Sequence, residues 1–107
     1  MGSSSRPRPA RLAGKLLEIR QKLGLSQNGM ARRLGLSQEL EQERISKYER
    51  GILEPPLHVL CAYADVANVY LEVLAKDELD LPGELPATHK SEGRRREKPK
   101  RRGTAND

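Results

Sequence analysis

Apolar residues recur at helical spacing near the start of the chain. In the first such segment they follow one another at steps of four, three and four: Leu12, Leu16, Ile19 and Leu23. This spacing places them on one face of a helix, and Gly24 supplies the left-handed residue that ends it. We therefore predict an amphipathic helix that ends at this glycine.

Two further amphipathic segments follow. Ser26 is placed to cap a second helix, which carries Met30, Ala31 and Leu34 inward. Gly35 closes that helix. A third segment ends at Gly51, with Ile45 and Tyr48 on its inner face and basic residues free to point outward. The pattern does not fix where this segment starts.

The remaining apolar pattern predicts two more helices. Pro55 and Pro56 mark the entry to a fourth helix. Its expected inner stripe is Leu57, Leu60, Cys61 and Ala64, with the lone cysteine as buried filler. A short fifth helix is expected over Tyr70–Ala75, and the ordered body is expected to end at Leu81. No strand pattern and no internal repeat is visible.

Length and composition limit the possible functions. The chain has 107 residues, 3% of them aromatic, with neither Phe nor Trp. This allows one small domain built from aliphatic side chains, which favours packed helices. A single cysteine excludes an internal disulfide and a multi-cysteine zinc site. With no apolar run of about 20 residues and no secretion signal, we expect a soluble, cytoplasmic protein.

The positive charge is concentrated at the C-terminus. Residues 88–107 hold eight basic and three acidic side chains, so the net charge of this segment is +5. This equals the net charge of the whole chain. A segment so poor in apolar residues has little to offset the entropy of ordering it, so we expect disorder. It could serve as a solubilising end or as a loose clamp on nucleic-acid phosphate.

The most informative stretch runs from Leu25 to Gly51. Two short helices joined by a glycine-containing turn form a V-shaped unit whose second helix can enter a duplex major groove, which is about 12 Å wide. Gly35 allows the chain to reverse, Leu36 fills the angle, and Ala31 allows close approach of the helices.

These segments resemble the helix-turn-helix domain of the XRE family, the Cro and phage-repressor type of bacterial regulator. The stretches that carry the resemblance are Leu25-Ser26-Gln27, Ala31-Arg32-Arg33-Leu34-Gly35-Leu36-Ser37 and Ile45-Ser46-Lys47-Tyr48-Glu49-Arg50-Gly51. The likeness covers residues 11–75. It implies an all-α, five-helix, lambda-repressor-like domain over residues 10–81, between a flexible arm at 1–9 and a disordered basic tail at 82–107.

The connection between the second and third helices is longer than is usual in the family. Residues 38–44 separate Ser37 from Ile45. The added residues either lengthen the recognition helix by about one turn or form a longer loop. Three acidic side chains in this segment suit a helix N-terminus but are repelled by phosphate.

The resemblance implies which residues contact DNA when the alignment is anchored on Ile45. The candidates for base contact are Gln42, Glu43, Arg44 and Lys47, with Gln38 as a further candidate in the added segment. Glutamine pairs with adenine, arginine or lysine with guanine, and glutamate accepts from cytosine. The candidates for phosphate contact are Gln27, Asn28, Ser46 and Arg50. Tyr70 and Val73 are the candidates for a dimer interface.

Other residues have simpler interpretations. We expect Arg32 and Arg33 to form a solvated helix face, and Glu49 to pair with a nearby arginine or an N-terminal amide group rather than to read a base. His58 and His89 have no neighbouring metal ligands in the sequence, so we expect surface histidines. We expect no cofactor and no enzymatic activity, since the acidic residues after 76 have no room for a substrate cleft.

Three functional hypotheses remain open. The first is a sequence-specific regulator, a repressor that binds a palindromic operator as a homodimer and associates with the nucleoid. The second is an antitoxin-type autoregulator that wraps a toxin partner with its C-terminal segment. The third is a non-specific nucleic-acid or protein adaptor that binds through its basic tail.

Overall fold

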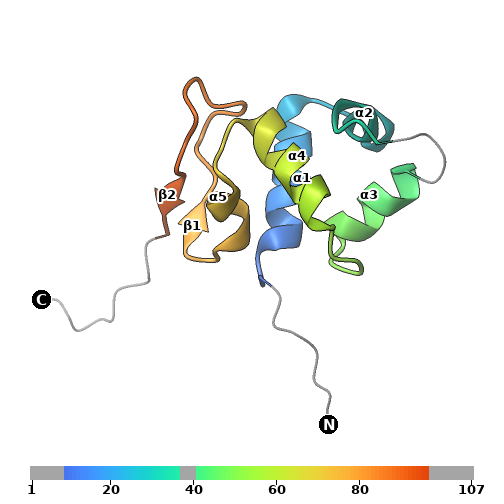
Figure 1. The fold of residues 1–107 in the computed structure, drawn as a ribbon, viewed down its shortest axis with the longest axis horizontal. Helices are drawn as coiled ribbons and strands as arrows, with labels where there is room; N and C mark the ends of the chain where they lie inside the picture. The colour runs from blue at the N-terminus through green and yellow to red at the C-terminus, as the bar shows by residue number, and fades with distance from the viewer. Residues whose placement is uncertain (1–8, 37–40, 97–107) are drawn as a thin grey trace, which may run out of the picture.

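The computed structural model describes residues 9–36 and 41–96, and these form five helices and one small sheet (Figure 1). The elements in chain order are α1 (Leu12–Leu23), α2 (Gln27–Arg33), α3 (Glu41–Glu49), α4 (Leu57–Ala67), α5 (Leu71–Ala75), β1 (Leu79–Asp80) and β2 (Arg94–Arg95). The predicted five-helix, all-α fold is confirmed. The two short strands were not predicted, because two residues are too few to show an alternating pattern.

The predicted end of α1 and the predicted start of α2 are confirmed by their capping geometry. Gly24 ends α1 with φ 72°, in the left-handed region, and its N–H donates to the carbonyl of Gln21 at 3.0 Å. The Ser26 hydroxyl accepts from the N–H of Gly29 at 2.9 Å. The chain therefore turns sharply between α1 and α2 with its backbone groups satisfied.

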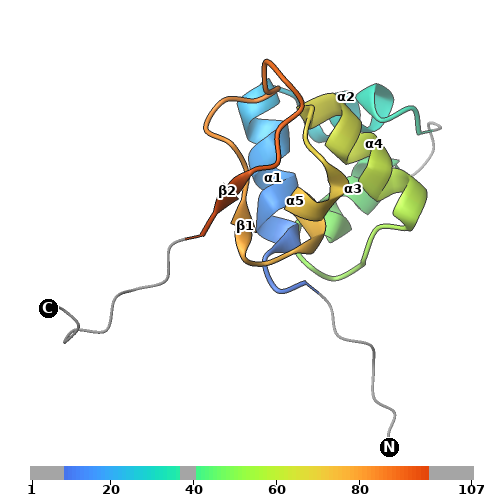
Figure 2. The same ribbon diagram turned by 60° about the vertical axis from the view of Figure 1, so that its left-hand side comes forward.

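Helix α1 lies at the centre of the body. It packs against α3 on one side and against α5 on the other, and both views place the strands and α3 on opposite sides of it (Figure 1 and Figure 2). The fully buried aliphatic and aromatic side chains that fill this core include Leu16, Ile19, Met30, Ile45, Tyr48, Tyr63, Val69 and Leu74.

The expected inner stripe of α4 is wrong at two positions. Leu57 is 66% exposed and Cys61 is exposed as well, so the cysteine is not buried filler. The helix instead turns Val59, Tyr63 and Ala67 inward, at steps of four. Val59 and Tyr63 occupy the core. Leu57 and Cys61, two residues before each of them, therefore lie on the outer face of the helix.

The buried Tyr63 carries a polar group that the core does not satisfy. Its side chain is fully buried, and its hydroxyl has no hydrogen-bond partner among the described residues. Burial, with a smaller contribution from the Glu49 charge, raises the pKa of Tyr63.

We expect Tyr63→Phe to stabilise the protein. The change removes the unsatisfied hydroxyl and keeps the ring, so the free energy of unfolding should rise by about 1 kcal/mol. Urea unfolding followed by circular dichroism gives this value from the shift in midpoint. A loss of stability of similar size would show that the hydroxyl is bonded after all.

The ordered body continues past Leu81, where the sequence predicted its end. Residues 82–96, called here the C-terminal strap, return along α5. The Ser91 carbonyl accepts from the Tyr70 N–H, and the Ser91 N–H donates to the Asn68 carbonyl, both at 3.0 Å. These are backbone bonds, which need no apolar side chains, so charge and hydropathy did not reveal them. Residues 97–107 of the expected tail lie outside the described residues.

A glycine allows the C-terminal strap to lie close to the body. Gly93 has φ +77°, and a Cβ there would lie 2.6 Å from the Asp80 carbonyl oxygen and 3.0 Å from a Val73 methyl group. Only glycine fits this position. Immediately after it, β2 pairs antiparallel with β1.

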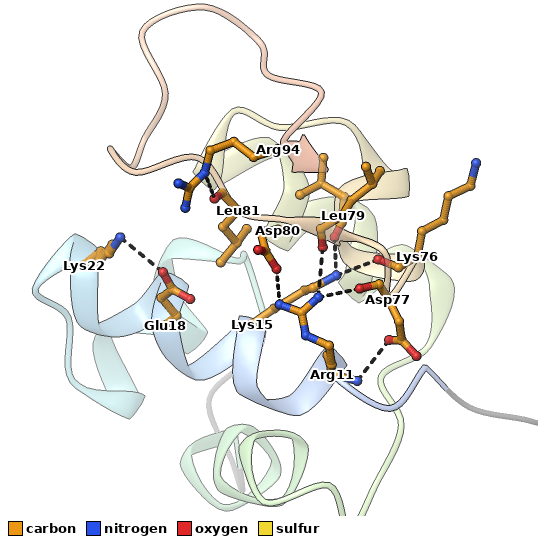
Figure 3. A network of polar contacts seen from close by, with 11 residues as sticks. Arg11, Lys15, Glu18, Lys22, Lys76, Asp77, Leu79, Asp80, Leu81 and Arg94 are labelled. Atoms are coloured by element: carbon orange, nitrogen blue, oxygen red, sulfur yellow. Dashed lines mark hydrogen bonds and ion pairs between the residues drawn. The ribbon is translucent and has the colours of Figure 1, made fainter. Parts of the chain in front are cut away.

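A polar network fixes the N-terminal end of α1 (Figure 3). The Asp77 carboxylate accepts from the N–H groups of Ala10 at 2.9 Å and of Arg11 at 3.0 Å, and these bonds lower the pKa of Asp77. The Arg11 guanidinium pairs with the Asp80 carboxylate, which lowers the pKa of Asp80. Because both pKa values are lowered, the network stabilises the fold above the usual carboxyl range, and this contribution is lost as the pH falls through the lowered values.

A buried lysine, Lys15, connects α1 to the C-terminal end of α5 next to this network. The Lys15 ammonium donates to the carbonyls of Val73 at 2.7 Å and of Lys76 at 2.8 Å, which terminate α5. The side chain is only 3% exposed, and burial, followed by the nearby Arg11 charge, lowers the pKa of Lys15. Lys15 therefore joins α1 to α5 through hydrogen bonds rather than apolar contact.

Candidate nucleic-acid interface

Helix α3 presents a polar outer face. It buries Ile45 and Tyr48 against α1 and α2, whereas Gln42, Glu43 and Arg44 are exposed. Residues 41–44 are helical, so the added segment lengthens the helix rather than forming only a loop. An α-helix with its side chains is about 10–12 Å in diameter, which a major groove about 12 Å wide admits.

The charges on this face are partly paired with each other. The Lys47 ammonium lies 3.7 Å from the Glu43 carboxylate, one turn earlier in the helix. Both side chains are solvent-exposed, so this pair is weak and can reopen toward a ligand. Arg44 is exposed and makes no ion pair within the described part of the chain. The outer face therefore presents the Arg44 guanidinium and the Gln42 amide as hydrogen-bonding groups.

A buried ion pair sets the position of α3. The Arg20 guanidinium donates to the Glu49 carboxylate at 2.7 Å and 3.1 Å, and also to the Leu25 carbonyl at 3.0 Å. The side chains are only 18% and 5% exposed for Arg20 and Glu49. This confirms that Glu49 is the structural partner of an arginine rather than a base reader.

The same carboxylate also contacts α2. The Gln27 amide nitrogen donates to Glu49 at 3.2 Å, so Glu49 joins α1, α2 and α3. One of the two amide hydrogens of Gln27 is used here, and within the described part of the chain the second has no acceptor, so it can donate to a phosphate. Arg20 was not among the residues predicted from the sequence. It directly follows Ile19 of the apolar stripe of α1, and this position indicated a partly buried charge.

The remaining candidates for phosphate contact are Asn28 in α2, Ser46 in α3 and Arg50 directly after α3. Asn28 is exposed in the first turn of α2. Arg50 donates to the Ser46 hydroxyl at 3.1 Å, which orients the guanidinium along the last turn of α3. The fold thus brings the candidates of α2 and α3 to one side of α1; Gln38 lies outside the described residues.

The predicted dimer residues do not form one exposed surface. Val73 is fully buried, because the C-terminal strap lies over it at Gly93, so its assignment to a dimer interface is wrong. Tyr70 is 42% exposed, and the Lys90 ammonium lies 4.5 Å from the centre of its ring.

The structure of residues 9–36 and 41–96 gives no support for a metal site or a membrane-spanning helix. No group of three or more potential metal ligands occurs in these residues, and His58 and His89 are both exposed, as expected. No helix in the described part of the chain has the length and hydropathy needed to cross a bilayer.

Comparison with known proteins places this geometry in context. A family model described as helix-turn-helix matches residues 16–74. The match begins within α1 and ends within α5, so it includes the α2–α3 unit and both residues of the buried ion pair. A search of curated proteins and a search of solved structures each found no match.

Proposed function

The chain belongs to the XRE-type helix-turn-helix family of DNA-binding transcription regulators, and from this premise we propose that it is a repressor that binds its operator as a homodimer. Helix α3 enters the major groove, and Gln42 and Arg44 read base edges there. The observation that carries this proposal is the exposed polar face of α3, held outward by the Arg20–Glu49 pair.

In this proposal the contacts divide into two kinds. Gln42, Glu43, Arg44 and Lys47 contact bases, whereas Gln27, Asn28, Ser46 and Arg50 position the protein on the phosphates. Selection of bound sites from a randomised duplex pool, followed by footprinting, tests the proposal. A conserved inverted repeat protected by the protein supports it, and recovery of unrelated sequences would overturn it.

We expect Arg44→Ala to weaken binding to the selected site by about 1–3 kcal/mol, or roughly 5- to 150-fold. Loss of a base contact should also relax the preference for one base pair. Arg33→Ala is the matched control, because this arginine is also exposed but lies on α2. Titrations of both variants against the selected site and single-base-pair changes of it measure the effect. An equal loss on every duplex would make Arg44 a phosphate contact.

We also expect the C-terminal basic residues to contribute non-specific affinity. Because residues 82–96 belong to the folded body, the change is confined to Lys98, Lys100, Arg101 and Arg102, each replaced by Gln in the full chain. Binding should weaken on operator and random duplex alike, and the slope of log K against log salt should fall by about 0.9 for each lost phosphate contact. An unchanged slope would show that this segment does not touch phosphate; loss of all binding would favour the adaptor hypothesis.

A further inference from the structure

A hollow beside the C-terminal strap combines an aromatic ring with two carboxylates. Its volume is about 360 Å³, and its lining includes Tyr70, Glu72, Leu79 and Glu92. We call it the Tyr70 hollow. Both glutamates are exposed, and neither forms an ion pair with another residue of the described part of the chain. The hollow therefore offers two carboxylates that the body leaves without a cationic partner.

A cation already lies against the wall of this hollow. The Lys90 ammonium is 4.5 Å from the centre of the Tyr70 ring, within the range of a cation–π contact. One ammonium beside two carboxylates leaves the hollow with a net negative charge. An aromatic ring and a net negative charge together favour a further basic side chain over an anion or an apolar group.

The chain leaves the described body next to the Tyr70 hollow. Strand β2 pairs with β1 so that Arg95 lies opposite Leu79, which lines the hollow. Both views show β2 beside β1, on the side of α1 away from α3 (Figure 1 and Figure 2). Lys98 and Lys100 follow Arg95 by three and five residues, so the chain lets them reach at most about 10 and 17 Å from it.

We propose that residues 97–102 return to the body and dock at the Tyr70 hollow, with Lys98 and Lys100 paired to Glu72 and Glu92. Each such pair is exposed and weak by itself. The short connection, however, holds the segment at an effective concentration in the millimolar range, which lets weak pairs form within one chain. The occupant is therefore this chain's own basic segment rather than a second copy.

Docking at the Tyr70 hollow limits contact between the basic segment and DNA. Exposed ion pairs are screened by salt, and the phosphates of a duplex compete for the same basic side chains. The segment is released only where phosphate displaces it, which lowers affinity for random duplex. This effect on DNA binding rests on the proposed function, whereas the docking itself does not.

Zero-length carbodiimide coupling tests the docking, because it joins an ammonium to a carboxylate only when the two groups are in contact. The full chain is treated at low concentration in the absence of DNA, and the linked peptides are identified by mass spectrometry. We expect links from Lys98 and Lys100 to Glu72 and Glu92.

Glu84 is the matched carboxylate in this experiment. It is exposed in the same strap and closer in sequence to Lys98 than Glu72 is, but it is not part of the lining of the hollow. Links to Glu84 should be at least tenfold fewer than links to Glu72. Equal linking to both glutamates would overturn the docking, as would links between copies in a mixture of isotope-labelled and unlabelled chains.

A charge-matched pair of variants tests the effect on DNA. Glu72→Gln combined with Glu92→Gln should raise affinity for random duplex by about threefold, the effect of losing two exposed ion pairs. Asp65→Asn combined with Glu84→Gln removes the same charge from exposed positions outside the hollow and should leave the affinity unchanged. The rise should also disappear when Lys98, Lys100, Arg101 and Arg102 are all replaced by Gln.

The outcomes separate this inference from the proposed function. A similar rise in both pairs of variants, or one that persists without the four basic side chains, would show a general loss of repulsion and overturn the effect on DNA. Operator binding without the expected links would overturn the docking alone. A chain that forms the links but selects no operator would keep the docking and contradict the proposed regulator.

Discussion

Glu49→Ala is expected to lower the free energy of unfolding by about 2–4 kcal/mol. Removing one partner of a buried ion pair leaves the other charge uncompensated, here a guanidinium that is 18% exposed and retains one bond to the Leu25 carbonyl. The same change also frees Gln27 from its contact with α3. Urea unfolding at neutral pH measures the loss.

The variant should also bind DNA less well than its stability alone explains, because α3 is no longer fixed against α1 and α2. Titration of the variant with DNA in the absence of urea, where the protein is folded, separates the loss of binding from the loss of stability. A double-mutant cycle with Arg20→Ala isolates the pairwise energy. If Glu49→Ala costs less than 1 kcal/mol, or if the two substitutions are additive, the pair does not hold α3 in place.

Lys15→Met is the second large effect that we expect, a loss of about 2–3 kcal/mol in stability. Methionine keeps the length of the apolar stem but cannot donate, so the carbonyls of Val73 and Lys76 lose charge-assisted hydrogen bonds of 2.7 and 2.8 Å. The end of α5 should loosen first.

The matched control is Lys22→Met, since Lys22 lies on the same helix and its contacts, an ion pair with Glu18 and a hydrogen bond to the Gly83 carbonyl, are solvent-exposed. It should change stability by less than about 0.5 kcal/mol. Hydrogen exchange at the amides of α5 distinguishes the proposed cause from general destabilisation: exchange there should rise more than in α2. Equal losses for both lysines would contradict the role of Lys15 as a cap.

The sequence predicted those parts of the fold that depend on local signals. Gly24 and Ser26 act within one or two turns of the chain, and their roles in ending α1 and starting α2 are confirmed. Ile45 and Tyr48 are inward, as their spacing indicated. The pairing of Glu49 with an arginine was also anticipated, but the identity of the partner depends on a contact between residues 29 positions apart.

Other features depend on contacts that spacing alone cannot rank. Lys15 falls on the apolar stripe of α1 between Leu12 and Leu16, which was a visible sign of burial, but its acceptors lie 58 and 61 residues away. In α4, two adjacent faces were similarly apolar, and the ring of Tyr63 decided between them. The roles of the DNA-contact candidates stay predictions, because they depend on a duplex.

The C-terminal strap has a practical consequence for anyone who shortens this chain. The helix pattern suggests a fragment cut after Leu81, but such a fragment would lose β2, the Ser91 bonds and the cover over Val73. It would present the bare edge of β1 beside the newly uncovered Val73, a combination prone to aggregation. Fusion tags and truncations are therefore better placed after residue 96, so that the bond from the Arg96 N–H to the Glu78 carbonyl is kept.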